Sequence, residues 1–249
     1  PGHGFAGSLA PQDATRIFTG APLPTGAVTI AIQEDVTANG QSITVNTATK
    51  TGDNIRPQGQ DFALGDTLSP RLLRPNDLAL LAAMNVPTVA VTRRPVVALI
   101  ATGDELVMPG EQPGPDQIIA SNTFALAAMI EAAGGQARML PIARDNEASL
   151  RTVFALTEGA DLIVTIGGAS VGDHDLVGKV ATDLGLERAF WKIAMRPGKP
   201  LMAGRVLGIP MLGLPGNPVS AIVCGHLFLV PMLKAMLGQP ATPQTLAAR

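Results

Sequence analysis

The stretch Gly-Leu-Pro-Gly-Asn-Pro-Val-Ser at residues 213–220 constrains the fold of this chain more than any other. The apolar run 210–214 predicts a buried strand, which two prolines and a glycine bring to an abrupt end. Asn217 is suited to cap a following helix, and Pro218 fits the first helical position, where its missing N–H costs nothing. A strand that enters a capped helix through such a turn presents free N–H groups and the positive end of the helix dipole to an anion.

Two strand ends upstream share this construction. A predicted strand at 96–101 ends in Thr-Gly-Asp-Glu, and one at 161–166 enters a glycine-rich turn at 167–172. In doubly wound sheets ligands bind beyond the carboxyl ends of the strands, where glycines let the backbone approach and carboxylates can hold Mg²⁺. Each turn alone is equally well an ordinary βα turn, but three together predict a site for a phosphorylated small molecule. The candidate residues are Thr102, Gly103, Asp104, Glu105, Gly167, Gly168, Ser170, Gly172, Pro215, Gly216, Asn217, Pro218 and Ser220, with His174 and Asp175 close behind the second turn.

The alternation of strands and helices after a boundary at 93–95 predicts an α/β fold, with a mostly parallel, doubly wound sheet and helices on both faces. Residues 1–92 are rich in turns with short β-branched runs, which predicts a smaller β-rich region before the α/β unit. The predicted strands are 28–32, 42–45, 96–101, 137–142, 161–166, 201–203 and 211–214, and the predicted helices are 77–84, 121–133 (capped by Ser121 and Asn122), 147–158, 175–184 and a helix after Asn217.

A cationic segment at 190–200 places Lys192, Arg196 and Lys199 within eight positions. Cations beside glycine and proline suit phosphate or oxyanion binding. The alternative is a solvated surface turn, but the neighbouring residues are unusually apolar for one.

Composition excludes several other classes of protein. The net charge of −2 provides no field that would attract nucleic acid or an anionic membrane. The apolar segment 219–233 is shorter than the roughly 18–20 residues that span a bilayer, which predicts a buried or interfacial helix. One cysteine, Cys224, permits no internal disulfide and fits the cytoplasm, as does the absence of a signal-peptide pattern at 1–4. The three histidines lack zinc-ligand spacing, and Walker A and Rossmann patterns are absent.

Together, the motifs at 102–106, 167–172, 196–200 and 213–220 resemble the molybdopterin molybdenumtransferase family (MoeA), which also contains the gephyrin E domain. Residues 16–24 and 54–61 match the family outside the α/β unit. The resemblance implies that adenylylated molybdopterin is bound, that molybdate enters its dithiolene and that AMP is released, assisted by Mg²⁺. Such a reaction needs a phosphoanhydride to be positioned and its charge neutralised.

The resemblance also assigns roles to residues. It implies a catalytic role for Thr19, Asp61, Glu105, Asp145, Asp175, Lys192 and Arg196, where Arg196 replaces the usual lysine of the family. It implies metal binding by Asp61, Glu105 and Asp175, and substrate binding by the turn residues above together with Lys199.

The family resemblance implies four regions in this chain. Residues 1–55 are the remainder of a β-rich second domain, 56–92 a segment of an elongated linker domain, 93–237 the α/β molybdopterin-binding domain and 238–249 the start of a C-terminal β domain. The chain is thus expected to lack the N-terminal and C-terminal parts of the family's proteins. It is expected to keep the ligand pocket but to lose turnover. The resemblance implies a cytoplasmic homodimer with a site shared between subunits. The expected protein partner is the molybdopterin adenylyltransferase, and neither nucleic acid nor membrane is expected to bind.

Two alternatives remain open from the sequence. The same α/β unit serves as a molybdopterin- or nucleotide-binding module or an adenylyltransferase, and a scaffolding role is known for the gephyrin relative. The motifs around Thr19 and Asp61 favour the molybdenumtransferase, because the stand-alone modules lack them. Fold analogy alone does not decide function.

Overall fold

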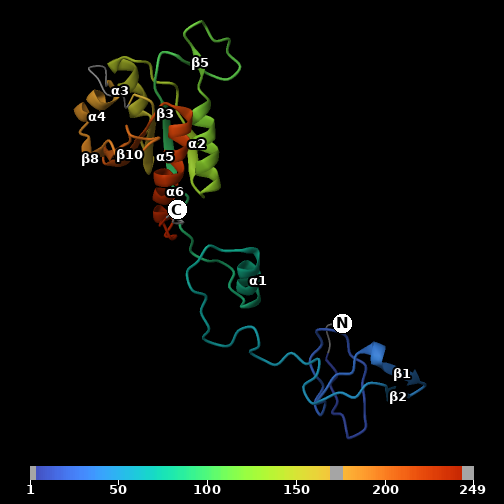
Figure 1. Ribbon diagram of the computed structural model, residues 1–249. Coiled ribbons are helices and arrows are strands. Elements are labelled where there is room, and N and C mark those ends of the chain that lie inside the picture. The colour runs from blue at the N-terminus through green and yellow to red at the C-terminus, as the bar shows by residue number, and fades with distance from the viewer. Residues whose placement is uncertain (1–3, 169–175, 243–249) are drawn as a thin grey trace. The chain divides into compact units, whose positions relative to one another are not determined.

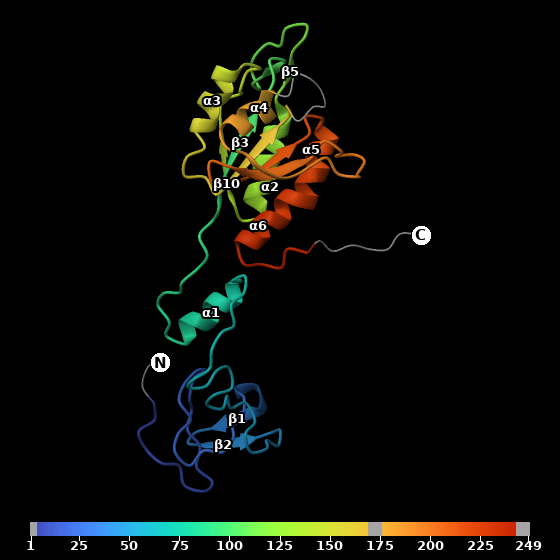
Figure 2. The same cartoon turned by 90° about the vertical axis from the view of Figure 1, so that its left-hand side faces the viewer.

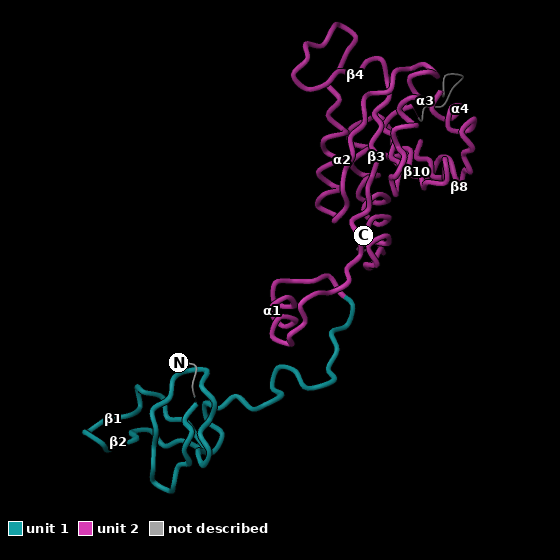
Figure 3. The backbone as a smooth tube through the Cα atoms, turned by 180° about the vertical axis from the view of Figure 1, so that it is seen from behind, with its two compact units in different colours: residues 1–70 teal, residues 71–249 magenta. Residues whose placement is uncertain are grey.

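The computed structural model of this chain describes residues 4–168 and 176–242 (Figure 1). The chain forms two compact units, Pro1–Pro70 (unit 1) and Arg71–Arg249 (unit 2), which are coloured separately in Figure 3. The finer division at residues 55, 92 and 237 stays a prediction.

Unit 1 contains one short hairpin. Its elements are η1 (Gln33–Asp35), β1 (Val36–Asn39) and β2 (Ser42–Val45), and the two strands pair antiparallel from Val36–Val45 to Asn39–Ser42. The predicted strand at 42–45 is confirmed, but the one at 28–32 is wrong. Residues 28–32 make isolated bonds, such as that from Ile30 N–H to Asp53 O (3.1 Å), rather than a ladder. A tight turn at Gly40 instead brings β1 onto β2.

Unit 2 is built on a six-stranded sheet in the order β6-β3-β7-β10-β9-β8. The four strands β6, β3, β7 and β10 run parallel, while β9 is antiparallel to both β10 and β8. The prediction of an α/β fold with a mostly parallel sheet is therefore confirmed. The strands are β3 (Val96–Ala101), β6 (Gln136–Met139), β7 (Leu162–Ile166), β8 (Glu187–Trp191), β9 (Met202–Val206) and β10 (Ile209–Leu214).

Helices cover both faces of the sheet, as predicted (Figures 1 and 2). Side chains alternate along β3, so Leu99 packs with α2 and α5, and Ile100 packs with α3 and α4. Both residues are fully buried. The helices are α1 (Pro75–Ala83), α2 (Ser121–Ala132), α3 (Glu147–Ala155), α4 (Leu176–Asp183), α5 (Pro218–Cys224) and α6 (Val230–Met236), the last two joined by the π turn η2 (Gly225–Leu229).

The apolar helix after Asn217 is longer than predicted. It runs from Pro218 to Met236, 19 residues with a mean hydropathy of 1.7, and so by length and composition it could cross a membrane. Cys224, Leu229 and Leu233 belong to the buried core beneath the sheet. We therefore interpret it as a helix that packs one side onto the core, which agrees with the predicted buried or interfacial helix.

Several elements differ from the prediction because their partners are distant in sequence. β8 was not predicted, and it forms the outermost strand of the sheet, where it pairs with β9. The short parallel pair β4 (Leu106–Val107) and β5 (Ile118–Ile119) was also missed. Helix α2 has Ala120 at its N-cap without a side-chain bond, so Ser121 and Asn122 do not cap it.

The Asp161 carboxylate joins the amino ends of the neighbouring strands β3 and β7. Asp161 accepts hydrogen bonds from the Arg93 guanidinium (2.7 and 2.8 Å) and from Val96 N–H (2.7 Å). These bonds, chiefly those from Arg93, lower the pKa of the Asp161 carboxyl below its ordinary value, against a smaller opposing effect of desolvation. The stabilisation that results is present above the unfolded-state pKa of about 4 and is lost as the pH falls through the lower folded-state pKa.

We expect Asp161→Asn to lower the free energy of unfolding by about 1 kcal/mol at pH 7, a modest value because Arg93 is exposed to solvent. The difference between wild type and variant should shrink as the pH falls below the unfolded-state pKa of about 4 and the wild-type carboxyl becomes protonated. Urea denaturation at pH 7 and pH 3 measures this. Asp183→Asn, which breaks the exposed pair with Arg151, is the control and should change little at either pH. A constant difference at both pH values would contradict the assignment.

Candidate functional site

The order of the sheet places a topological switch point between β3 and β7. The chain leaves β3, forms β6 on one side and returns to form β7 on the other side of β3. At such a point the turns that follow the two strands diverge and leave a crevice at the carboxyl ends. We call this edge of the sheet, where β3, β6, β7 and β10 end, the carboxyl edge.

Three predicted turns meet at the carboxyl edge. Gly167 has φ of +88°, and a β-carbon there would lie 3.0 Å from the carbonyl oxygen of Thr102. A β-carbon on Gly216 would lie 3.4 Å from the α-carbon of Gly167. The turns after β3 and β7 thus approach each other closely at Gly167, and the turn after β10 lies beside them, so residues far apart in the sequence come together.

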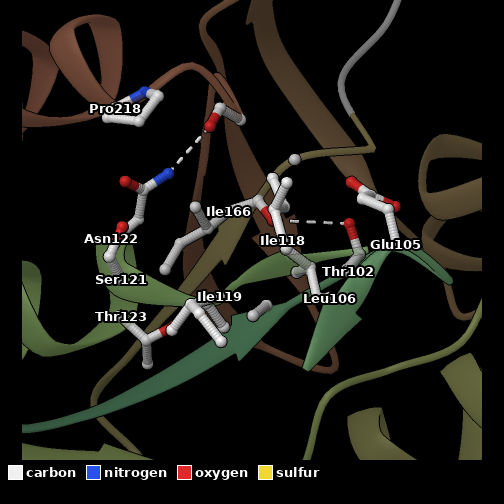
Figure 4. A pocket seen from close by; sticks show the side chains of 14 residues that line it. Thr102, Glu105, Leu106, Ile118, Ile119, Ser121, Asn122, Thr123, Ile166 and Pro218 are labelled. Carbon is white, nitrogen blue, oxygen red and sulfur yellow. Dashed lines mark hydrogen bonds between the residues drawn. The ribbon is translucent and has the colours of Figure 1, made fainter. Parts of the chain in front are cut away.

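The start of α5 is capped as predicted. Asn217 Oδ1 accepts a hydrogen bond from Ser220 N–H (3.1 Å), and Pro218 occupies the first helical turn. An unpredicted bond joins this junction to α2, because Asn122 Nδ2 donates to the carbonyl oxygen of Gly216 (2.7 Å; Figure 4). The amino ends of α2 and α5 therefore border the same space.

A pocket opens between these elements (Figure 4). Its lining includes five of the predicted residues: Thr102, Glu105, Gly167, Gly216 and Pro218. It also includes six that sequence reasoning missed: Leu106, Ile118, Ile119, Ser121, Asn122 and Thr123. The first turn of α2 was foreseen only as a helix start, and β5 had no local signal.

Arg144 is a further residue that the sequence did not single out. Its Nη1 donates to the carbonyl oxygens of Leu106 (2.9 Å), Asp104 (3.2 Å) and Gly103 (3.4 Å). Beside it, the N–H of Asp145 donates to Asp104 Oδ1 (3.1 Å). These bonds fasten the turn after β3 to the segment after β6, so two predicted site carboxylates, Asp104 and Asp145, lie together.

The cationic segment also reaches the carboxyl edge. Because β9 is antiparallel to both β8 and β10, β8 runs in the direction of β10, and the turn after it lies at this edge. Ile193 and Met195 of the turn pack against the core, whereas Arg196 and Lys199 are exposed. The Lys192 ammonium lies 4.0 Å from the ring centre of Trp191, a favourable cation–π contact.

Known families match both parts of the chain. Residues 98–235 match the family described as probable molybdopterin binding domain, and residues 1–85 match the MoeA N-terminal region (domain I and II). The chain belongs to the molybdopterin-binding domain family.

Similar proteins cover almost all of this chain. It is 36% identical to a molybdopterin molybdenumtransferase of Nostoc sp. over 93% of this chain and 54% of that protein. It is 37% identical to molybdopterin molybdenumtransferase 2 of Mycobacterium tuberculosis over 94% of this chain and 60% of that protein. The crystal structure of a molybdopterin biosynthesis MoeA protein from Pyrococcus horikoshii superposes with a TM-score of 0.79 and 34% identity, covering 96% of this chain and 60% of that one. The chain spans between about half and three fifths of the length of these relatives.

Four candidate residues of this molybdopterin-binding domain, Ser170, Gly172, His174 and Asp175, lie outside the described residues. Thr19 and Asp61 belong to unit 1, where Asp61 forms a bidentate pair with Arg56 (2.7 Å from Nη2 to Oδ1, 3.0 Å from Nε to Oδ2). That pairing raises the pKa of the Arg56 guanidinium above its ordinary value. The roles of these residues, and those of all the other predicted site residues, stay predictions.

Glu105 is the described carboxylate best placed for a metal in this domain. It is exposed at the pocket and forms no salt bridge with any residue in 4–168 or 176–242. Mg²⁺ is commonly held by one or two carboxylates with water and substrate phosphates, so Glu105 fits this ion. Within the same ranges, no group of three His, Cys, Asp or Glu side chains gathers as a metal site. The set of Asp61, Glu105 and Asp175 stays a prediction.

Cys224 lies in the core of this domain rather than at the site. It is fully buried, and desolvation raises the pKa of its thiol above the ordinary value. A raised pKa disfavours the reactive thiolate, in keeping with the structural role expected for this cysteine.

Proposed function

We propose that the protein containing this chain is a molybdopterin molybdenumtransferase, which inserts molybdate into the dithiolene of adenylylated molybdopterin and releases AMP. The observation that carries this proposal is the match of both chain regions, in order, to the MoeA N-terminal region and the molybdopterin-binding domain. Relatives of that name align with 93–94% of this chain.

The charges along the carboxyl edge support phosphoanhydride chemistry. In the proposed reaction Lys192, Arg196 and Lys199 neutralise phosphate or molybdate oxygens, and preorganised cations of this kind stabilise developing negative charge. Mg²⁺ held by Glu105, with Asp61 and Asp175 as further proposed ligands, would supply additional neutralisation of the phosphates. Thr19 and Asp145 complete the proposed catalytic set.

The proposed assembly is a cytoplasmic homodimer whose site combines residues of two subunits. Its substrate is delivered by a molybdopterin adenylyltransferase. The exposed position of Thr19 and of the pair formed by Asp61 and Arg56 in unit 1 supports such sharing, because exposed polar side chains are available to another surface.

The proposal is tested by molybdate-dependent AMP release from adenylylated molybdopterin. The assay compares this chain with a protein in which the flanking regions of the family are restored, each with and without molybdate. We expect release by the restored protein only when molybdate is present. Tight substrate binding without release by either protein would contradict the enzyme and indicate a binding module.

A further inference from the structure

Trp191, the only tryptophan of the chain, ends the outermost strand of the sheet. It lies opposite Met202 where β8 pairs with β9 (Figure 1), and its side chain is 37% exposed. Among the described residues, two cations lie over its ring, the Lys192 ammonium at 4.0 Å and the Arg188 guanidinium at 5.3 Å from the ring centre. Both distances are within the range of about 6 Å for cation–π attraction. The indole therefore gathers positive charge at the start of the cationic segment.

The contact between Trp191 and Lys192 depends on an unusual backbone conformation. In an extended strand neighbouring side chains point to opposite faces, so consecutive residues do not touch. Lys192 ends this alternation with a φ of +67°, in the left-handed region. That region is costly for a residue with a β-carbon, and such strain is found most often at functional sites. The strand thus ends in a conformation that allows the ammonium to lie over the indole.

The surrounding structure holds Lys192 in this conformation. Its N–H donates to the carbonyl oxygen of Leu201 (2.8 Å), and the N–H of Ile193 donates to the carbonyl oxygen of Lys199 (3.0 Å). Leu201 is fully buried, and Ile193 packs against the core. The backbone at Lys192 is therefore fixed from both ends of the cationic segment. The remaining freedom is that of the lysine side chain, which the ring restrains.

The ring restrains the ammonium without neutralising it. No carboxylate of residues 4–168 or 176–242 forms a salt bridge with Lys192 or Arg188. Lys179 of α4, by contrast, is paired with Glu147. A carboxylate cancels the charge of its partner, whereas an aromatic ring attracts a cation through its quadrupole and carries no net charge. Lys192 therefore keeps its full positive charge for an incoming anion.

We propose that Trp191 is a positioning residue, whose ring fixes the Lys192 ammonium at the carboxyl edge for an oxyanion of the substrates, either phosphate or molybdate. The assignment rests on the proposed function insofar as that function supplies both oxyanions. A free lysine side chain takes many rotamers, and its restraint before the anion arrives reduces the entropy that is lost on binding. Arg188, over the same ring, adds positive potential near the ammonium.

The test is a double-mutant cycle in which binding of AMP and of molybdate to this chain is measured by isothermal titration calorimetry. Trp191→Leu removes the ring and keeps an apolar side chain, and Lys192→Met removes the ammonium. We expect Trp191→Leu to weaken binding of at least one anion about fivefold when Lys192 is present. In the Lys192→Met background the same substitution should change affinity less than about twofold, because the ring then has no ammonium to position.

Two further variants control for the loss of an exposed aromatic side chain. Trp191→Phe keeps an aromatic face and should recover part of the affinity. Phe190→Leu is the matched control, because Phe190 precedes Trp191 in the same strand, is 38% exposed and has no cation over its ring in the described part of the chain. Phe190→Leu should leave binding of both anions unchanged. The anion whose binding Trp191→Leu weakens identifies the oxyanion that Lys192 meets.

Three results would overturn the assignment. They are wild-type affinity in Trp191→Leu, an equal loss of affinity with and without Lys192, and the absence of binding of both anions to the wild-type chain. Coupling between Trp191 and Lys192 without molybdate-dependent AMP release in the restored protein would instead contradict only the proposed function, so the two can fail separately.

Discussion

Gly167→Ala is expected to lower the free energy of unfolding by about 3 kcal/mol and to abolish measurable AMP binding. An L-residue at a φ of +88° costs about 1–2 kcal/mol. The added methyl would also press on the backbone oxygen of Thr102 at 3.0 Å and on its hydroxyl at 3.2 Å. Thr102 is 3% exposed at the end of a buried strand and has no room to move, so the overpacking adds a further cost of about 1–2 kcal/mol.

The loss of AMP binding follows from the contact between turns. Displacement of Gly167 moves the turn after β7 relative to Gly216 and the start of α5, and with them the border of the pocket. Urea denaturation and AMP titration measure the two effects. Gly159→Ala is the control, because its φ is +72° and nothing lies within 4 Å of an added β-carbon. The free energy of unfolding of this variant should fall only by the backbone cost of the positive φ, and AMP binding should be retained. Equal losses in both variants would contradict the importance of the contact between the turns.

Arg144→Met is expected to reduce turnover of the length-restored protein about a hundredfold. The guanidinium bonds to the carbonyl oxygens of Gly103, Asp104 and Leu106, and hydrogen bonds from a charged group are worth about 1.5–3 kcal/mol. Methionine keeps most of the aliphatic stem and removes the donors, so the turn that carries Glu105 loses its support. A loss of about 3 kcal/mol in positioning corresponds to that factor in rate.

Two further variants separate positioning from general stability. Arg144→Lys keeps the charge but offers a point donor in place of a planar fork, and we expect it to recover part of kcat. Arg205→Met removes a guanidinium bond to Gly208 O (2.7 Å) in the turn between β9 and β10, at the opposite edge of the sheet, and should leave kcat unchanged. Steady-state kinetics with varied Mg²⁺ is the measurement. Normal kcat in Arg144→Met with reduced unfolding stability would show a purely structural residue.

Some features of the site follow from residues close in sequence. Asn217 caps α5 by accepting a hydrogen bond from the N–H of Ser220, three positions later, and Pro218 lies in the first turn of the helix. This junction could therefore be predicted without knowledge of the rest of the fold. The alternation of buried strands and helices likewise predicted the α/β unit. The strand at 28–32 was wrong because a β-branched run forms a strand only if another segment pairs with it.

Other features depend on contacts between distant segments. Asn122 bonds Gly216 across 94 residues, and Arg144 bonds Gly103 across 41. The pairing of β4 with β5 has no local signal either, and it supplies Leu106, Ile118 and Ile119 to the lining of the pocket. None of these partners could be chosen from the sequence, because many turns offer similar carbonyl oxygens.

The cap of α5, the glycine turns and the class of fold could be predicted from the residues alone, because they depend on backbone preferences and on side chains within a few residues. Which turns meet depends on how the sheet packs. The order of the strands brings the ends of β3, β7 and β10 to one edge and leaves a crevice where that order reverses. The pocket exists because the sheet packs in that order, and its lining follows from where the chain returns to that edge.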